Sequence, residues 1–228
     1  MIRLACVLLL AAAASASAGA SSGGGELERL PTAKKVVALT FDGGGNGGGI
    51  RLILRTLRRR RVPATFFITG AWVRHYPHYA RAIGRRYAVG DHTYDHSDLT
   101  HLSSAQVRQE IVRARWWIRA GTGRDPKPLF RFPYGARDAR TLAIVHRLGY
   151  VSVRWSLDTW GWMGPSEGQS VDTVVRRFED GLEPGAIVLM HLGFARDDSL
   201  LDARALGRVI TVARRRGYRF VTLGRWVR

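Results

Sequence analysis

The chain contains 228 residues, has a mass of 25.4 kDa and is 46% hydrophobic. A chain of this length and apolar content can bury a sizeable core, so disorder throughout is excluded and a single domain is expected. Its 36 Lys and Arg residues outnumber its 18 Asp and Glu residues and give a formal net charge of +18. This charge favours a partner rich in phosphate or carboxylate, but all except three of the basic residues are arginine, a skew that codon bias alone produces.

The first 18 residues have the pattern of a secretory signal peptide. Arg3 supplies a positive start, residues 4–14 form an apolar run, and residues 16–18 provide a small-residue cleavage site. An uncleaved membrane anchor is the alternative, although the apolar run is shorter than the roughly 20 residues that span a bilayer. A lipoprotein signal fits less well, because Cys6 comes too early in the run. We therefore expect a secreted or cell-wall-associated protein with no stable membrane insertion after cleavage.

Residues 19–33 are mostly small or polar and show no period, which predicts a flexible linker. The folded domain is expected to occupy residues 34–228. The only cysteine, Cys6, lies in the predicted signal peptide, so the mature domain needs no disulfide and tolerates an oxidising exterior. No apolar segment is left unclaimed, which favours a monomer.

From residue 34 onwards, short β-branched and apolar runs alternate with longer helical patterns, as in βα units that build a parallel sheet. We expect strands over residues 35–41, 64–69, 87–90, 129–132, 150–157, 186–190 and 219–223. We expect helices over residues 50–61, 72–85, 103–120, 139–148, 171–181 and 201–216. Seven strands joined by helices favour a barrel-like α/β fold, and an open doubly wound sheet also fits the pattern.

Chemically active side chains follow these strands at one end. Asp42 ends the first predicted strand, His92 follows the third and Arg131 lies in the fourth. Asp158 closes the fifth strand and His191 closes the sixth. The carboxyl ends of parallel strands share one edge, where the active sites of parallel α/β folds are built. The five positions together therefore predict one site.

Two histidines near this edge have the spacing of metal ligands. His92 and His96 are four residues apart, so both imidazoles can face one point, and neutral imidazole is the commonest ligand for zinc and related divalent ions. A solvated polar loop explains the pair equally well, and Asp42 before three glycines is also explained as a turn residue. His191, at the mouth of a wholly apolar strand, is a candidate general acid.

Five segments, in this order, resemble the polysaccharide deacetylase family, the carbohydrate esterases with a chitooligosaccharide deacetylase homology domain. The segments are residues 40–44 (TFDGG), 92–96 (HTYDH), 131–135 (RFPYG), 155–159 (WSLDT) with Trp162, and 187–191 (IVLMH). The resemblance covers essentially residues 34–228. It implies a distorted (β/α)7 barrel and the metal-assisted removal of acetyl groups from sugars.

The resemblance also implies roles for individual residues. His92 and His96 would hold a divalent metal, with zinc the favoured ion, that polarises the acetyl carbonyl and acidifies bound water. Asp42 would act as the base, and Arg131 would keep its carboxylate ionised. The backbone N–H of Tyr134 would stabilise the oxyanion together with the metal.

On the other side of the implied site, His191 would protonate the departing amine, which is a poor leaving group until it is protonated. Asp158 joins the catalytic set at the same strand end. Trp160 and Trp162 would form walls for a sugar, since an aromatic face stacks on the apolar face of a pyranose. Ordinary core packing is the alternative explanation for both tryptophans.

Two positions depart from the family pattern. Gly43 stands where the family usually has a second aspartate that binds the metal, and Gly161 stands where many members have an aspartate that orients the acid histidine. The metal site would keep only two protein ligands, and its affinity would fall, unless Asn46, Asp91 or Asp95 substitutes.

The expected function is that of a secreted, metal-dependent hydrolase that removes N-acetyl groups from an amino-sugar polymer such as peptidoglycan or a chitin-like glycan. Two alternatives stay open: an O-acetyl esterase acting on a polysaccharide such as acetyl xylan, and a catalytically inactive carbohydrate-binding relative. Nucleic-acid binding through residues 58–61 and 214–216 is disfavoured, because both arginine runs end predicted helices, where cations are stabilised by the helix dipole and face solvent. The net charge would instead hold the chain near an anionic cell envelope.

Overall fold

The computed structural model describes residues 26–193 and 198–227 of the chain. The predicted signal peptide (1–18) and the first part of the predicted linker (19–25) lie outside the described residues. Within those two ranges, no helix combines the length and the apolar character needed to cross a membrane.

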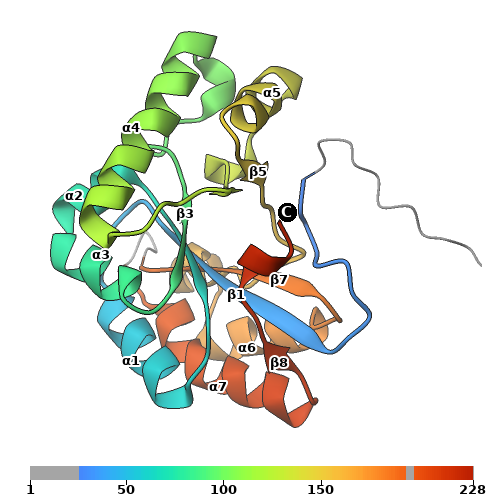
Figure 1. Cartoon of the computed structure of the whole chain (residues 1–228). Coiled ribbons are helices and arrows are strands. Elements are labelled where there is room, and N and C mark those ends of the chain that lie inside the picture. Colours follow the sequence, from blue (N-terminus) through green and yellow to red (C-terminus); the bar gives the residue numbers. More distant parts are fainter. Residues whose placement is uncertain (1–25, 194–197, 228) are drawn as a thin grey trace, which may run out of the picture.

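The named strands form one parallel sheet that curls into an incomplete barrel (Figure 1). They are β1 (Val36–Gly43), β2 (Thr65–Ile68), β3 (Ala88–Asp91), β4 (Leu129–Phe130), β5 (Val151–Ser152), β6 (Leu157–Asp158), β7 (Ala186–His191) and β8 (Arg219–Phe220). The sheet runs in the order β5-β4-β3-β2-β1-β7-β6, and β8 pairs with the start of β1 off this path. The near-sequential order belongs to a barrel and not to a doubly wound sheet, so the predicted distorted (β/α) barrel is confirmed.

The single strand predicted over residues 150–157 is wrong, because this segment forms two short strands, β5 and β6, at opposite edges of the curled sheet. Between them the backbone leaves the sheet, and the Arg131 side chain satisfies its carbonyl groups. Arg131 Nε donates to the Val153 carbonyl oxygen at 3.2 Å, and Nη2 donates to the Arg154 carbonyl oxygen at 3.1 Å. A buried guanidinium group therefore supplies hydrogen bonds at the seam where the barrel is incomplete.

Helices surround the sheet (Figure 1). They are α1 (Ile50–Arg60), α2 (Gly70–His75), α3 (Pro77–Gly84), α4 (Ser104–Thr122), α5 (Ala139–Arg147), α6 (Val171–Asp180) and α7 (Leu201–Arg215). The single helix predicted over residues 72–85 is two helices, because Tyr76 leaves the helical conformation (φ −122°, ψ 55°) and Pro77 starts α3. Proline is favoured in the first turn of a helix, where its missing N–H costs no hydrogen bond.

The core lies between the sheet and the helices, with β1 at its centre. Every residue of β1 is buried, and β1 pairs with β2, β7 and β8. Phe41 of β1 stacks on Phe66 of β2, with ring centroids 5.2 Å apart. On α1, the buried residues Ile50, Ile53 and Leu57 repeat at helical spacing and join the same core. The strand that carries the first motif is thus held from both sides and from the helix layer.

The folded domain begins earlier in the chain than the sequence predicts. Leu30 is 1% exposed and packs in a cluster with Val36. Leu27 forms a parallel bridge with Val153 at the seam of the barrel. The prediction of a flexible linker is therefore wrong for residues 26–33. Composition did not reveal this docking, because two isolated leucines in a polar segment provide the packing.

Leu30→Ala is expected to lower the free energy of unfolding by about 2–5 kcal/mol, since it removes a buried side chain from a packed cluster. Lys34→Ala, at an exposed position of the same segment, is the control and is expected to change the free energy by less than about 0.5 kcal/mol. Chemical denaturation measures both values. Equal stabilities of the two variants would contradict the docking of this segment.

Candidate active site

A cavity of 460 Å³ opens at the carboxyl edge of the sheet, and it contains most of the residues that the sequence predicts to be functional. Its lining includes Asp42, His92, His96, Phe132, Tyr134, Trp155, Asp158, Trp162 and His191. Of the predicted site residues, only Arg131 and Trp160 are not in the lining. Arg131 is buried behind Asp42, and Trp160 lies outside the cavity.

Asp42 and Arg131 form a buried ion pair. Arg131 Nη1 donates to Asp42 Oδ1 at 2.7 Å and to Thr40 Oγ1 at 2.9 Å. With its two bonds to the barrel seam, Arg131 uses all three guanidinium nitrogens inside the protein. The Phe67 ring lies against the guanidinium group, with 4.1 Å between its centroid and Arg131 Cζ. The arginine is therefore fixed in one position, and it fixes the carboxylate.

This ion pair decides the charge of Asp42. Burial by itself would raise the pKa of the carboxyl group, but Arg131, together with His92 and His191, outweighs burial and lowers the pKa below its usual value. Asp42 is therefore ionised at neutral pH. A charged carboxylate at the wall of a cavity can accept a proton from a bound water molecule.

His92 and His96 lie together in the cavity, with ring centroids 4.8 Å apart. The Arg131 carbonyl oxygen is 2.8 Å from His92 Nδ1, which fixes this nitrogen as the donor and leaves Nε2 without a proton in the neutral ring. Nε2 is 3.5 Å from Asp42 Oδ2. Two acceptor atoms thus face each other, an arrangement that a cation between them relieves. This is the orientation of a metal-binding histidine with its second nitrogen hydrogen-bonded to the protein.

Both histidines are neutral at neutral pH. Burial lowers the pKa of His92 despite the nearby Asp42 carboxylate. Burial, reinforced by the neighbouring His92, lowers the pKa of His96 to about 3. Neutral imidazole is the form that binds metal ions.

The loop that carries the histidines has an unusual backbone. Thr93 and His96 adopt left-handed conformations, with φ of 67° and 71°. Glu110 of α4 stabilises the loop by accepting hydrogen bonds through Oε2 from the backbone N–H groups of Tyr94 and Asp95, at 3.0 Å and 3.1 Å. Left-handed non-glycine residues are costly and persist only where the surroundings impose them. Glu110 was not predicted, since it lies in a helical pattern remote in sequence from the motifs.

No third protein ligand joins the two histidines. In the part of the chain that the structure describes, no group of three or more His, Cys, Asp or Glu side chains is placed to hold a metal ion. The candidates for substitution make other contacts: Asp91 accepts from Tyr150, Asp95 from Ser97, and Asn46 from a backbone N–H of its own loop. Asp91 and Asp95 therefore do not join the two histidines, and the lower metal affinity expected from Gly43 stays a prediction.

The space for the missing aspartate at position 43 is filled. A Cβ atom on Gly43 would lie 2.6 Å from Cδ1 of the fully buried Leu192 and 3.2 Å from Cγ2 of Ile68. An apolar contact thus occupies the place where a carboxylate would enter. The residues present fit a metal ion held by two imidazoles beside Asp42, with lower affinity than the three protein ligands of ordinary catalytic zinc sites provide.

Asp158, Trp162 and Tyr134 also line the cavity. Asp158 accepts hydrogen bonds from the Trp160 N–H at 2.9 Å and from Trp162 Nε1 at 3.3 Å, and burial raises its pKa. Tyr134 has a left-handed backbone (φ 58°), and its ring meets the edge of His96 with 4.6 Å between centroids. Trp162 and Tyr134 thus present aromatic surface to a bound ligand.

Trp160 is not a wall of this cavity, so that prediction is wrong. The chain turns through a left-handed conformation at Trp160 (φ 59°), and the side chain packs outside the cavity. Arg177 of α6 covers its ring, with Cζ 3.1 Å from the ring centroid. Trp162, two residues later, lines the cavity.

Asp202, a residue of α7 that the sequence did not single out, holds the backbone of His191. Asp202 is 4% exposed, and its Oδ2 accepts a hydrogen bond from the His191 backbone N–H at 2.9 Å. The same oxygen is 3.7 Å from His191 Nδ1. Asp202 Oδ1 accepts from Thr159 Oγ1 at 2.6 Å. The carboxylate is therefore fixed on both oxygens and lies beside the imidazole.

Gly161 leaves room for this carboxylate. A Cβ atom at position 161 would overlap Asp202 Oδ1, and its next neighbour would be Asp202 Cγ. The backbone at Gly161 lies outside the left-handed region, so a side chain is blocked there by Asp202 and not by the conformation of the main chain. The Asp202 carboxylate of α7 therefore occupies the space that a side chain at position 161 would take.

Carboxylates around His191 favour its charged form. Burial opposes protonation of the imidazole, but Asp202 and the more distant Asp42 and Asp158 outweigh it and raise the pKa of His191 above its usual value. A larger fraction of His191 is therefore protonated near neutral pH, which suits proton donation. Its side chain is 25% exposed, so the ring remains accessible from the cavity.

The position of Asp202 in the sequence gives one indication of its role. Asp202 lies in the first turn of a predicted helix, where an acidic residue is ordinarily explained by the helix dipole. The helix begins just beyond the strand that His191 closes, so the two residues are at the same edge of the barrel. An acidic residue at this edge is therefore a candidate site residue.

A barrel edge that combines an ionised aspartate, two neutral histidines and an opposed histidine with a raised pKa defines a hydrolase site for attack of water on a carbonyl group. Comparison with known proteins agrees. The family model described as polysaccharide deacetylase matches residues 29–153. The chain belongs to the polysaccharide deacetylase family, also called carbohydrate esterase family 4, and its curated relatives include hydrolases.

The chain is 34% identical over 192 residues to a chitooligosaccharide deacetylase of Bradyrhizobium, covering 80% of this chain and 86% of the relative. It is 32% identical over 201 residues to the peptidoglycan-N-acetylglucosamine deacetylase PgdA of Listeria monocytogenes, covering 87% of this chain and 40% of that one. Among solved structures, a family 4 pseudoenzyme from Bacillus anthracis superposes with a TM-score of 0.81 at 26% identity, covering 90% of this chain and 70% of that chain.

Arg131→Met is expected to lower the free energy of unfolding by about 3–5 kcal/mol, since it leaves the Asp42 carboxylate buried without its partner. The double variant Asp42→Asn with Arg131→Met removes both charges and is expected to recover a large part of this loss. Chemical denaturation of the two variants and of the unchanged protein measures the coupling. If the double variant is less stable than R131M, the unpaired Asp42 carboxylate is not the cause of the lost stability.

Proposed function

We propose that the protein is a secreted, metal-dependent deacetylase that removes N-acetyl groups from an amino-sugar polymer such as peptidoglycan or a chitin-like glycan. The observation that carries this proposal is the ionised Asp42, which faces two neutral histidines and lies in one cavity with His191. A site that only binds sugar has no need of a buried guanidinium group that keeps a carboxylate charged. The names of the bacterial relatives support the substrate class.

The attacking water is activated on the Asp42 side of the cavity. A divalent metal ion at His92 and His96, with zinc favoured, supplies Lewis acidity to the acetyl carbonyl and to water when it is bound. Asp42 takes up the proton that the water loses, and Arg131 keeps Asp42 ionised until then. The N–H of Tyr134 contributes to stabilising the charge that develops on the carbonyl oxygen.

His191 acts on the leaving group. It donates its proton to the sugar nitrogen as the carbon–nitrogen bond breaks, because an amine leaves readily only in its protonated form. Asp202 serves as the positioning residue, since it binds the His191 backbone N–H, lies beside the imidazole and favours its charged form. It takes the place of the aspartate that many family members have at position 161. Asp158 and Trp162 form the wall along which the sugar lies.

Two other activities compete with this proposal. An O-acetyl ester needs less help from a general acid, so the same residues serve an esterase on acetyl xylan. A catalytically inactive carbohydrate-binding relative is favoured by one observation, the filling of the position 43 pocket by Leu192, and a pseudoenzyme is among the similar structures. Acetate release from N-acetylglucosamine oligomers, peptidoglycan and acetyl xylan, measured side by side, separates the three.

Removal of metal is expected to abolish acetate release, and added zinc to restore it. His92→Ala is expected to lower both bound metal and turnover by at least about 100-fold, since half of the imidazole donor set is lost. Metal analysis of the purified protein and acetate assays provide the readouts. Equal metal content and equal turnover in H92A and the unchanged protein would remove the metal from the proposal.

The variant Gly43→Asp with Leu192→Ala is the matched gain-of-ligand control, because the second change makes room for the first. It is expected to reach half-maximal activity at a lower zinc concentration than the unchanged protein. If the unchanged protein releases no acetate from any of the three substrates at any zinc concentration, it is instead the catalytically inactive carbohydrate-binding relative.

Asp202→Ala is expected to lower kcat at least about tenfold, as loss of the carboxylate behind a catalytic histidine does elsewhere. The alkaline limb of the pH–rate profile is expected to move to lower pH, because the raised pKa of His191 falls when the carboxylate is removed. Substrate binding, measured as KM, is expected to change little. These quantities come from initial rates between pH 5 and pH 10.

The double variant Gly161→Asp with Asp202→Ala moves the carboxylate beside His191 from residue 202 of α7 to residue 161. It is expected to recover part of the lost turnover and to move the alkaline limb back. Gly161→Ala with Asp202 intact is expected to lower turnover by displacing Asp202. If the double variant is no more active than D202A and its alkaline limb is unmoved, Asp202 has only a structural role.

A further inference from the structure

The positive charge of this protein is concentrated in two stretches of the chain that contain no acidic residue, residues 43–90 and residues 203–228. Residues 43–90 contain ten arginines and no Asp or Glu, so this stretch provides more than half of the net charge of +18. It builds α1, α2 and α3 with the strand β2 between them, on one side of the barrel (Figure 1).

Five of these arginines line a groove between α1 and the segment that runs from α3 into β3. The groove has a volume of 570 Å³. Arg51, Arg55 and Arg58 repeat every three to four residues and form one wall from a single face of α1. Arg85 and Arg86 follow α3 and contribute to the other wall. The remaining lining residues are Leu54, His78, Tyr79, Ala82 and Tyr87.

None of the five groove arginines forms an ion pair or a side-chain hydrogen bond with another described residue, and all five are exposed. Like charges spaced four apart on a helix are destabilising by about 0.2–0.5 kcal/mol per pair, and no acidic residue offsets this cost for Arg51 and Arg55. Some exposed arginines elsewhere in the described chain do pair with acids, as Arg208 does with Asp172.

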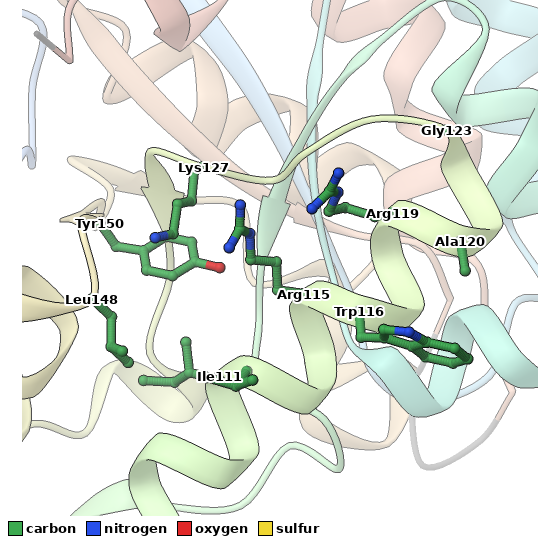
Figure 2. A pocket seen from close by; sticks show the side chains of 10 residues that line it. Ile111, Arg115, Trp116, Arg119, Ala120, Gly123, Lys127, Leu148 and Tyr150 are labelled. Atoms are coloured by element: carbon green, nitrogen blue, oxygen red, sulfur yellow. The ribbon is translucent and has the colours of Figure 1, made fainter.

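A second cavity shows the contrast (Figure 2). It has a volume of 640 Å³ and lies beside α4, where Figure 2 shows Arg115 and Lys127 next to Tyr150 and Arg119 further along the helix. There Arg115 makes two hydrogen bonds to Asp125, through Nε at 3.0 Å and Nη2 at 2.5 Å. The positive charge of that cavity is thus partly neutralised from within the protein, whereas the charge of the groove is left for a ligand.

We propose that the groove between α1 and α3 binds a linear polymer whose charges are phosphodiester groups separated by polyol or sugar units. Guanidinium groups bind phosphate oxygens in a two-pronged geometry, which accounts for five arginines on the two walls. The half-buried Leu54, Tyr79 and Ala82 offer apolar contact to the carbon units between phosphates. Binding of single-stranded nucleic acid relies on exposed aromatic platforms for the bases, and in this groove Tyr87 is buried and Tyr79 half-buried.

The groove runs along α1 from near the active-site cavity towards the opposite edge of the sheet. Helix α1 starts at the carboxyl edge of the sheet, so Arg51 lies near the edge that holds the active site, and Arg58 lies about 10 Å further along the helix axis. A wall polymer held in the groove would keep an attached glycan close to the cavity. This last step rests on the proposed function, whereas binding in the groove does not require turnover.

The triple variant Arg55→Gln, Arg58→Gln, Arg85→Gln removes charge from both walls and keeps good helix formers. Its control is Arg108→Gln, Arg147→Gln, Arg176→Gln, which removes the same charge at exposed positions outside the groove. Binding of poly(glycerol phosphate) of defined length is measured by titration calorimetry at two salt concentrations. The groove variant is expected to bind at least about tenfold more weakly and with a flatter salt dependence, since fewer counterions are released. The control is expected to bind within about threefold of the unchanged protein.

Equal loss of affinity in both triple variants would overturn the proposal, because total charge and not the groove would then account for binding. Failure of the unchanged protein to bind the polymer would also overturn it. Tighter groove-dependent binding of single-stranded DNA, or of the carboxylate polymer hyaluronate, would replace it with another ligand class. Acetate release from a short N-acetylglucosamine oligomer is expected to be the same in both triple variants. Polymer binding without any acetate release would contradict the proposed function and leave the groove assignment intact.

Discussion

Arg131 donates hydrogen bonds from all three of its guanidinium nitrogens to groups inside the protein. Two bonds reach the carbonyl oxygens of Val153 and Arg154, where the barrel is incomplete, and one reaches Asp42 at the floor of the cavity. Its own carbonyl oxygen is paired with His92 Nδ1 and thereby sets the tautomer of that ring. One residue therefore connects barrel closure, the charge of the base and the orientation of a ligand histidine. A buried ion pair is weak support for stability, but it is a firm constraint on position and charge.

The sequence predicted the barrel and the edge that holds the site, because both follow from the repeat of strands and helices and from the strand ends. It failed where one element depends on a distant one. Between β5 and β6, backbone groups of the segment 150–157 bond to Arg131 and Leu27, and the segment before residue 34 docks through Leu27 and Leu30. Trp160 and Trp162 are alike in sequence, and only the backbone turn between them decides which one faces the cavity.

The two departures from the family pattern have different physical consequences. At Gly161 the missing carboxylate is replaced from α7, since Asp202 fills the same space and contacts His191. At Gly43 the space is taken by Leu192, and no described acidic residue replaces the ligand. The general acid His191 thus has a neighbouring carboxylate from α7, while the metal site has only His92 and His96 among the described residues. This difference could not be deduced from the motifs, since a substitute from another element leaves no mark at the motif position.

Arg131 holds the buried Asp42 carboxylate ionised. A carbon-13 NMR titration of the aspartate carboxyl carbons, with Asp42→Asn used to assign the signal, measures this directly. We expect a midpoint below about 3.9, the usual value for aspartate, despite the burial of the group. A midpoint at or above that value would show that burial outweighs the ion pair, and it would contradict the assignment of Asp42 as the ionised base.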